Sequence, residues 1–182
     1  MNGSEITIPY LTPNQTSVTG DWWIYVSNAS SNNPRTLEFD LFWGNGTNTA
    51  MWGTHSEFGD AANPGVWKLD AQDAAYTGIE WQPAVDAQTG LAIPCNLAPS
   101  QWHHIRWQVH QDPNVGKIYY DYLTIDDTTH ILTGASKTRS YKDPMRTQFD
   151  TLGIQVQQDM NVSSSSPVSV TEYVDSMSLT YW

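Results

Sequence analysis

The longest regular alternation in the chain begins the stretch WHHIRWQVHQDPNVGKIYYDYLTID, which runs from Trp102 to Asp126. Apolar and polar residues alternate from 102 to 111, with Ile105, Trp107 and Val109 on one side of the chain. Because successive side chains of a strand point to opposite faces, this alternation predicts a strand that is buried on one face. Residues 112–116 contain Pro, Asn and Gly and predict a turn, after which residues 117–125 return. The stretch therefore predicts an antiparallel β-hairpin.

On both sides of this stretch the same alternation of apolar and polar residues recurs along the chain, whereas helical periodicity is nearly absent. Loops are predicted where Pro, Gly and Ser cluster, including 83–99 and 136–144, and 70–77 is the one candidate for a short helical turn. Roughly ten short strands without helical crossovers predict an all-β, antiparallel two-sheet β-sandwich, a jelly roll with a concave groove, as a single domain over residues 1–182. The other predicted strands cover residues 21–26, 36–43, 49–55, 66–70, 79–82, 152–157 and 174–182.

The Trp102 to Asp126 stretch resembles the laminin-G-like branch of the concanavalin A-like lectin/glucanase superfamily. That branch has W-H-H before an alternating strand, a Gly-containing turn and a strand that carries Tyr and Asp. The segments TLEFDLFW (residues 36–43) and VDSMSLTYW (residues 174–182) are compatible with the same fold. The resemblance implies concave and convex antiparallel sheets. It implies function only broadly, since this fold supports lectins, carbohydrate-binding modules, glycoside hydrolases and polysaccharide lyases.

Charge narrows the possible partners. The chain has 8 basic and 19 acidic residues, a formal net charge of −11, which repels nucleic acid and anionic membranes. Neutral polysaccharides or oligosaccharides face no such repulsion. The one cysteine, Cys95, excludes an internal disulfide, and we expect it to be buried.

The expected location is extracellular. Residues 1–20 lack the basic start and apolar core of a signal peptide. A composition poor in Lys and rich in Ser, Thr and Asn, together with 9 Trp, nonetheless favours a secreted protein without its signal peptide. Such a chain can also be one module of a larger secreted protein. A cytosolic location is the alternative.

A polar stripe alternates with the apolar side of the 102–111 strand. It consists of His104, Arg106, Gln108 and His110, and we expect Tyr120, Tyr122, Gln155 and Gln157 to face it. Such side chains suit sugar hydroxyls, which require both donors and acceptors. They also resemble the inventory of alginate-lyase-type jelly rolls, where Arg and Gln neutralise a uronate and His or Tyr moves a proton. The motifs of that family are absent, and the negative charge disfavours an anionic substrate.

Two carboxylates, Glu38 and Asp40, share one face of the predicted 36–43 strand. In the laminarinase/lichenase family such a strand carries E-x-D-x-E, whereas Phe42 occupies the third position here, so the family mechanism is not carried over. The aromatic residues Trp23, Phe42 and Trp52 are predicted opposite the core, where they offer flat platforms for sugar rings. The prediction requires the polar stripe and the two carboxylates to line one groove.

No cofactor is expected, and a structural Ca²⁺ is the one metal considered. Three histidines, His103, His104 and His110, do not have zinc spacing, because His103 points away from the others. The calcium candidates are loop and strand aspartates, namely Asp126, Asp127 and Asp175.

The favoured function is a lectin-like domain that binds a neutral polysaccharide by aromatic stacking and hydrogen bonds. One alternative is a glycoside hydrolase that uses Glu38 or Asp40 with a carboxylate from another strand; a polysaccharide lyase is a further variant. The second alternative is a structural or adhesive extracellular domain whose groove is filled by its own loops.

Overall fold

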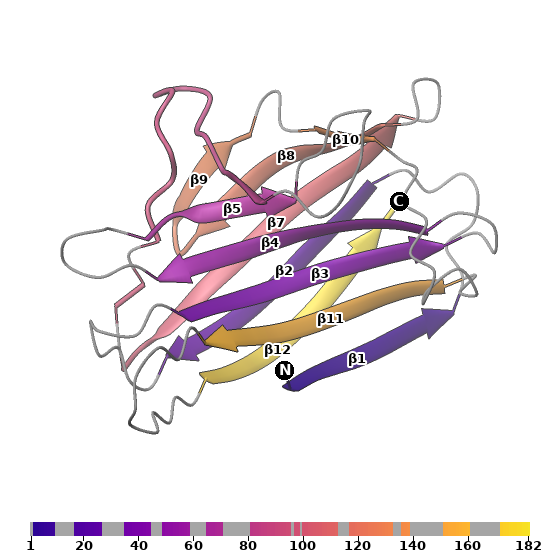
Figure 1. Cartoon of the computed structure of the whole chain (residues 1–182), viewed down its shortest axis with the longest axis horizontal. Coiled ribbons are helices and arrows are strands. Elements are labelled where there is room, and N and C mark those ends of the chain that lie inside the picture. The colour runs from indigo at the N-terminus through magenta and orange to yellow at the C-terminus, as the bar shows by residue number, and fades with distance from the viewer. Residues whose placement is uncertain are drawn as a thin grey trace.

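The computed structural model is a sandwich of two antiparallel sheets (Figure 1). It describes residues 2–9, 17–26, 35–44, 49–58, 65–70, 81–95, 97–98, 100–112, 117–132, 136–138, 151–160 and 172–182. Within these residues, sheet A has the strand order β1-β11-β3-β4-β5-β6, and sheet B has the order β10-β8-β7-β2-β12, with β9 paired to β8. Sheet A lies in front of sheet B in Figure 1, and the strands of the two sheets cross at an angle. The predicted fold class is confirmed.

The strand bounds agree with the alternating pattern and extend it. The predicted hairpin is present, since β7 and β8 pair in antiparallel register. Three strands were not predicted, namely β1, β9 and β10, and β10 falls in the segment 136–144 that was expected to be a loop. The candidate helical turn 70–77 lies outside the described residues beyond Asp70. The strands are β1 Asn2–Pro9, β2 Ser17–Val26, β3 Arg35–Gly44, β4 Thr49–Phe58, β5 Trp67–Asp70, β6 Trp81–Pro83, β7 Trp102–Asp112, β8 Lys117–Ile125, β9 Thr128–Ile131, β10 Ser136–Thr138, β11 Thr151–Met160 and β12 Glu172–Tyr181.

Stacked aromatic rings join the two sheets. Trp22 of β2 stacks on Phe39 of β3 with a centroid distance of 4.1 Å, and it meets Trp107 of β7 edge-on at 5.7 Å. These three side chains are at most 3% exposed. Because Trp22 and Phe39 belong to different sheets, their contact defines the inner face of each sheet. Ile105, Trp107 and Val109 are buried as predicted.

Gly20 leaves the room that the two indoles need. It is the cross-strand partner of Trp107. A Cβ at this position would lie 2.8 Å from ring carbons of both Trp107 and Trp22. These ring atoms are buried and cannot move away, so only a residue without a side chain fits at this position of β2.

The segment 84–97 closes the open side of the core near β5. Its backbone bonds to β5 through Ala84 N–H to Trp67 O and Trp67 N–H to Ile93 O, both at 3.0 Å or less. Ala84, Ile93, Cys95 and Leu97 are all buried, including the predicted Cys95. The expected surface loop 83–99 is therefore partly a core element. Its alternate positions 93, 95 and 97 are apolar, the period that marks an extended, half-buried chain.

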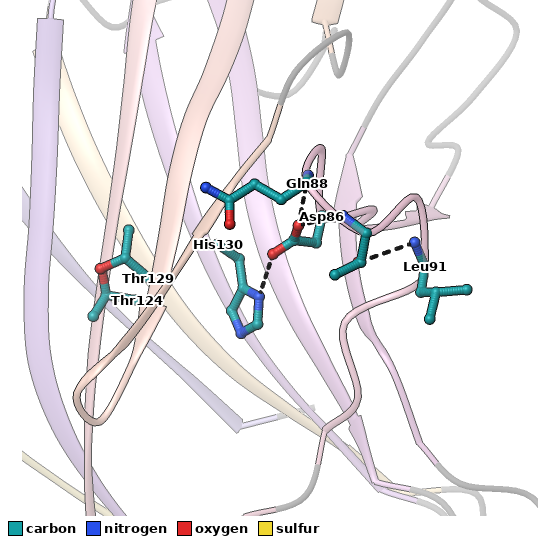
Figure 2. Close-up of polar contacts among 7 residues, drawn as sticks. Asp86, Gln88, Leu91, Thr124, Thr129 and His130 are labelled. Atoms are coloured by element: carbon teal, nitrogen blue, oxygen red, sulfur yellow. Dashed lines mark hydrogen bonds and ion pairs between the residues drawn. The ribbon is translucent and has the colours of Figure 1, made fainter.

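Asp86 fastens this segment to β9 (Figure 2). Its Oδ1 accepts hydrogen bonds from the backbone N–H groups of Gln88 (2.7 Å) and Thr89 (3.1 Å), and its Oδ2 lies 2.7 Å from Nδ1 of His130. The His130 hydrogen bond holds the pKa of Asp86 below its ordinary value, against the opposing effect of burial. One carboxylate thus shapes the turn and attaches it to sheet B. Thr124 and Thr129, also in Figure 2, join β8 to β9 through their hydroxyls at 2.9 Å.

Among the described residues, the structure contains no helix with the length and apolarity that a membrane crossing requires.

Substituting Gly20→Ala should lower the free energy of unfolding by about 1–3 kcal/mol, the usual cost of overpacking a core. The added methyl group collides with Trp22 and Trp107. Chemical denaturation followed by tryptophan fluorescence measures the effect. Thr19→Ala, on the opposite side of the same strand, is the control and should cost less. Equal stability of Gly20→Ala and wild type would contradict the close packing described here.

Candidate functional site

The candidate site is the outer face of sheet B, the side turned away from the Trp22–Phe39 contact. We call it the β7 face. Alternation along each strand puts there every second residue of β2 and β7. The register aligns these residues in rows across the sheet, so that Trp23 pairs with His104 and Asp21 pairs with Arg106. The residues of the β7 face used below are Asp21, Trp23, Tyr25, Trp102, His104, Arg106, Gln108, His110, Tyr119, Asp121, Tyr122, Thr124, Tyr173 and Asp175.

Asp21 is the first of two carboxylates that organise this face. Its Oδ1 lies 2.7 Å from Nε2 of His104, and its Oδ2 accepts from Nε and Nη2 of Arg106 at 2.8 and 2.7 Å. Partial burial acts to raise the pKa of Asp21. The hydrogen bonds from His104 and Arg106 outweigh it, so the pKa lies below its ordinary value. The Arg106 side chain remains 46% exposed, so its remaining N–H donors face solvent.

Asp121 of β8 is the second organising carboxylate. Its Oδ2 accepts from the side-chain amide of Gln108 at 2.9 Å, and its Oδ1 lies 2.6 Å from Nδ1 of His110. The register shifts between Gln108 and Val109, which marks a β-bulge. His110 also stacks on Tyr119, with a centroid distance of 5.1 Å and an interplanar angle of 18°. The four members of the predicted stripe are thus held by only two carboxylates.

Trp23 stands upright on the β7 face. Its ring stacks on that of His104, with a centroid distance of 4.7 Å and an interplanar angle of 11°. Neighbouring strands of a sheet are about 4.7–4.9 Å apart. Two parallel rings on paired residues at this distance stand upright on the sheet, and each ring turns its faces toward the neighbouring strands. Trp23 is 39% exposed, so part of its ring remains open to solvent.

A second row of aromatic residues lies two residues further along the strands from the Trp23–His104 pair. Tyr25 contacts Trp102 at 5.5 Å and Tyr173 at 5.9 Å between ring centroids, with interplanar angles of 54° and 63°. Trp102 is 44% exposed and Tyr173 is 54% exposed. The rings are tilted and therefore present edges and hydroxyls as well as faces.

The predicted single groove is wrong, because Glu38 and Asp40 belong to the other sheet. They lie on β3 of sheet A, on the side opposite Phe39. They point away from the β7 face, with the whole core between. Both are also buried, at 8% and 5% exposure. Side-chain parity within each strand was predicted correctly, but parity carries no information about which sheet a strand joins.

Other members of the expected groove are displaced for related reasons. Tyr120 is buried in the core at 2% exposure, because the bulge opposite Gln108 shifts its strand by one position. Tyr122 is the cross-strand partner of Gln108, as expected. Gln157 pairs with Glu38 on sheet A and so does not face the stripe.

Three predicted residues have side chains outside the described part of the structure, and only their register is stated. Gln155 is the partner of Asp40, and Phe42 is the partner of Met51. Trp52 is the partner of Leu41, which alternates with Phe42 along β3. The predicted outward direction of Phe42 and Trp52 stays a prediction.

The calcium candidates do not meet. Asp126, at φ 52° in the β8–β9 turn, accepts from His104 N–H with Oδ1 and lies 3.0 Å from Nδ1 of His103 with Oδ2. Asp127 is an exposed neighbour in the same turn, and Asp175 lies on β12. Within the described ranges, no three His, Cys, Asp or Glu side chains gather as metal ligands. His103 is buried and points away from His104, as predicted. Calcium binding stays a prediction.

Several residues of the β7 face were not predicted, and the signal for most of them is parity. Asp21 and Tyr25 alternate with the apolar Trp22 and Ile24, so the same argument that selected Trp23 selects them. Trp102 lies two residues before His104 on β7 and therefore belongs to the same set of alternate positions. Asp121 breaks the alternation of β8 because it belongs to the bulge, and the sequence gives no sign of that.

The β7 face can therefore bind hydroxyl-bearing ligands. It presents an open indole ring, a guanidinium with free donors, and carboxylate and amide acceptors. The indole is held by its stack on His104 and the polar groups by mutual hydrogen bonds, so little side-chain entropy is lost when a ligand binds.

The depressed pKa of Asp21 predicts how stability depends on pH. Its stabilising contribution is present above the unfolded-state pKa, near 3.8, and is lost as pH falls through the lower folded-state value. Asp21→Asn should therefore be less stable than wild type at pH 6, and the difference should shrink as the pH drops below about 4. Thermal unfolding at a series of pH values measures this. Asp127→Asn controls for the loss of one charge, and a difference that stays constant down to pH 2 would contradict the account.

No protein-family model matches the chain, and no curated protein matches it in sequence. Among solved structures, a double mutant of the alginate lyase Aly36B in complex with an alginate trisaccharide superposes with a TM-score of 0.56 at 12% identity, over 97% of this chain and 73% of that chain. Another Aly36B structure superposes with a TM-score of 0.54 at 13% identity, over 90% and 69% of the two chains. At such identities the likeness establishes the fold alone. The chain has an antiparallel β-sandwich fold of the jelly-roll type, as these structures do.

Proposed function

We propose that this protein binds a neutral polysaccharide on its β7 face and does so without catalysis. The observation that carries the proposal is Trp23, which stands upright and half-exposed beside fixed hydrogen-bonding groups. Sugar rings have apolar C–H faces and polar hydroxyl edges. The indole of Trp23 can stack on the C–H face, and the neighbouring Asp21–Arg106 pair can form hydrogen bonds with the hydroxyl groups.

Charge favours a neutral ligand over an acidic one. Arg106, the basic side chain of the predicted stripe, is already paired with Asp21 through two nitrogens. Asp121 and Asp175 add further negative charge to the face, and the chain as a whole carries −11. A uronate-containing polymer such as alginate, which the lyase Aly36B carries as a trisaccharide, would be repelled here.

The hydrolase alternative has weaker support. Glu38 and Asp40 are buried on sheet A, and a glycosidase needs two carboxylates on either side of an accessible scissile bond. We further propose an extracellular location, which fits a polysaccharide ligand and the composition of the chain.

Calorimetric titration with xylan, mannan and mixed-linkage glucan, together with pull-down on cellulose, tests the function. Trp23→Ala should weaken binding to the best ligand about two- to tenfold, because stacking contributes about 0.5–1.5 kcal/mol and a tenfold change in affinity is 1.4 kcal/mol. Tyr181→Ala is the matched control: it removes an exposed aromatic side chain from the same sheet, at a position that pairs with the core residue Val18. The control should bind like wild type.

Two outcomes would count against the proposal. One is a folded wild-type protein that binds none of these polysaccharides. The other is binding that Trp23→Ala and Tyr181→Ala weaken equally, because the β7 face would then not be the site.

A further inference from the structure

The edge of the β7 face contains a bulge beside Trp23. Strand β12 pairs with β2 from Glu172 to Asp175 and again from Ser178, and the register shifts between Asp175 and Ser178. Ser176 lies in the bulge with a φ of 53°, a conformation that non-glycine residues rarely adopt. Bulges of this kind re-aim a side chain at the edge of a sheet.

The side chain at this bulge is Asp175, the cross-strand partner of Trp23. Its Oδ1 accepts a hydrogen bond of 2.7 Å from the backbone N–H of Ser176. This bond fixes the orientation of the carboxylate. The residue is exposed, so the carboxylate can meet a ligand from solvent.

Trp23 has one occupied ring face and one that looks toward β12. Strands β12, β2 and β7 are neighbours in that order. His104, on β7, covers one face of the indole in a near-parallel stack. The opposite face is therefore turned toward β12, where the residue in register is Asp175.

We propose that Trp23 and Asp175 form a subsite for one neutral pyranose ring. The ring stacks on the β12-facing side of the indole, and Asp175 accepts hydrogen bonds from its hydroxyls. The same carboxylate excludes uronates, whose own carboxylates would lie against it. Asp175 is thus the specificity-determining residue of the face. This inference rests on the proposed polysaccharide function and assigns its substrate class to one residue.

The surrounding groups agree with this assignment. Tyr173, two residues before Asp175, is 54% exposed and contacts Tyr25, which extends the aromatic surface along the strands. His104 and Asp21, on the far side of Trp23, are bonded to each other, and Asp175 is the carboxylate of β12 in register with Trp23. Met177 packs against the core and anchors the bulge from below.

The test compares Asp175→Asn with wild type on two ligands, the best neutral polysaccharide found and an alginate trisaccharide. Asn keeps the shape of Asp and removes its charge. Neutral binding should weaken about fivefold, because hydrogen bonds to a charged acceptor are roughly twice as strong as neutral ones. Alginate binding should become stronger than in wild type, and the gap should close at high salt, where charge repulsion is screened.

Matched variants separate a subsite from a general effect of charge or folding. Asp127→Asn removes the same charge from an exposed turn of sheet B and should leave both affinities unchanged. Ser176→Gly accepts a positive φ without strain and should keep the bulge, the binding and the folded state. Thermal unfolding of each variant checks that it is folded.

The results distinguish this inference from the proposed function. If Trp23→Ala weakens binding of the neutral polysaccharide and Asp175→Asn changes the affinity for neither ligand, the proposed subsite is wrong and polysaccharide binding on the β7 face remains supported. The subsite is equally wrong if Asp127→Asn strengthens alginate binding as much as Asp175→Asn does. If Trp23→Ala has no effect either, the proposed function itself fails.

Discussion

The contact between Trp22 and Phe39 determines which side chains of both sheets point into the core and which point outward. It is the closest aromatic stack described, and it joins β2 of sheet B to β3 of sheet A. Once these rings meet, alternation assigns an inner or outer direction to each neighbouring residue on both strands. Trp23 and Asp21 must then face outward, and so must their partners His104 and Arg106. The arrangement of the β7 face is a geometric consequence of the core, and the absence of a side chain at Gly20 lets the two indoles pack there.

Sequence predicts this structure well at the level of the single strand. The burial of Ile105, Trp107 and Val109 follows from period two, as does the outward direction of the polar stripe between them. Sequence does not predict which strands become neighbours. Glu38 and His104 each follow the alternation of their own strand, yet they belong to different sheets, on the sides turned away from the Trp22–Phe39 contact. Parity is a local property, whereas sheet membership depends on long-range pairing that a single sequence does not encode in a visible pattern.

Bulges account for most of the remaining differences. One extra residue opposite Gln108 and Val109 turns Tyr120 inward and Asp121 outward, against simple alternation. A second bulge after Asp175 has the same unpredictable character. The segment 84–97 differs for another reason. Its Pro and Gly content is typical of a surface loop, but burial of Ile93 and Cys95 outweighs that local preference. The stabilisation comes from apolar area removed from water, which composition does not reveal.

Both bulges occur where the β7 face acquires a carboxylate, and this gives the face its chemical character. Asp21 lies in a regular part of β2 and pairs with Arg106, so its charge is neutralised by a neighbour. Asp121, at the first bulge, reaches both Gln108 and His110 because the bulge brings it within their range. Asp175, at the second bulge, is directed toward solvent beside Trp23, held by its neighbouring backbone N–H. Asp21 and Asp121 thus hold neighbouring side chains in place, whereas Asp175 is an acceptor directed toward solvent. This arrangement of charges supports the proposed preference for ligands that carry hydroxyl groups over ligands that carry carboxylates.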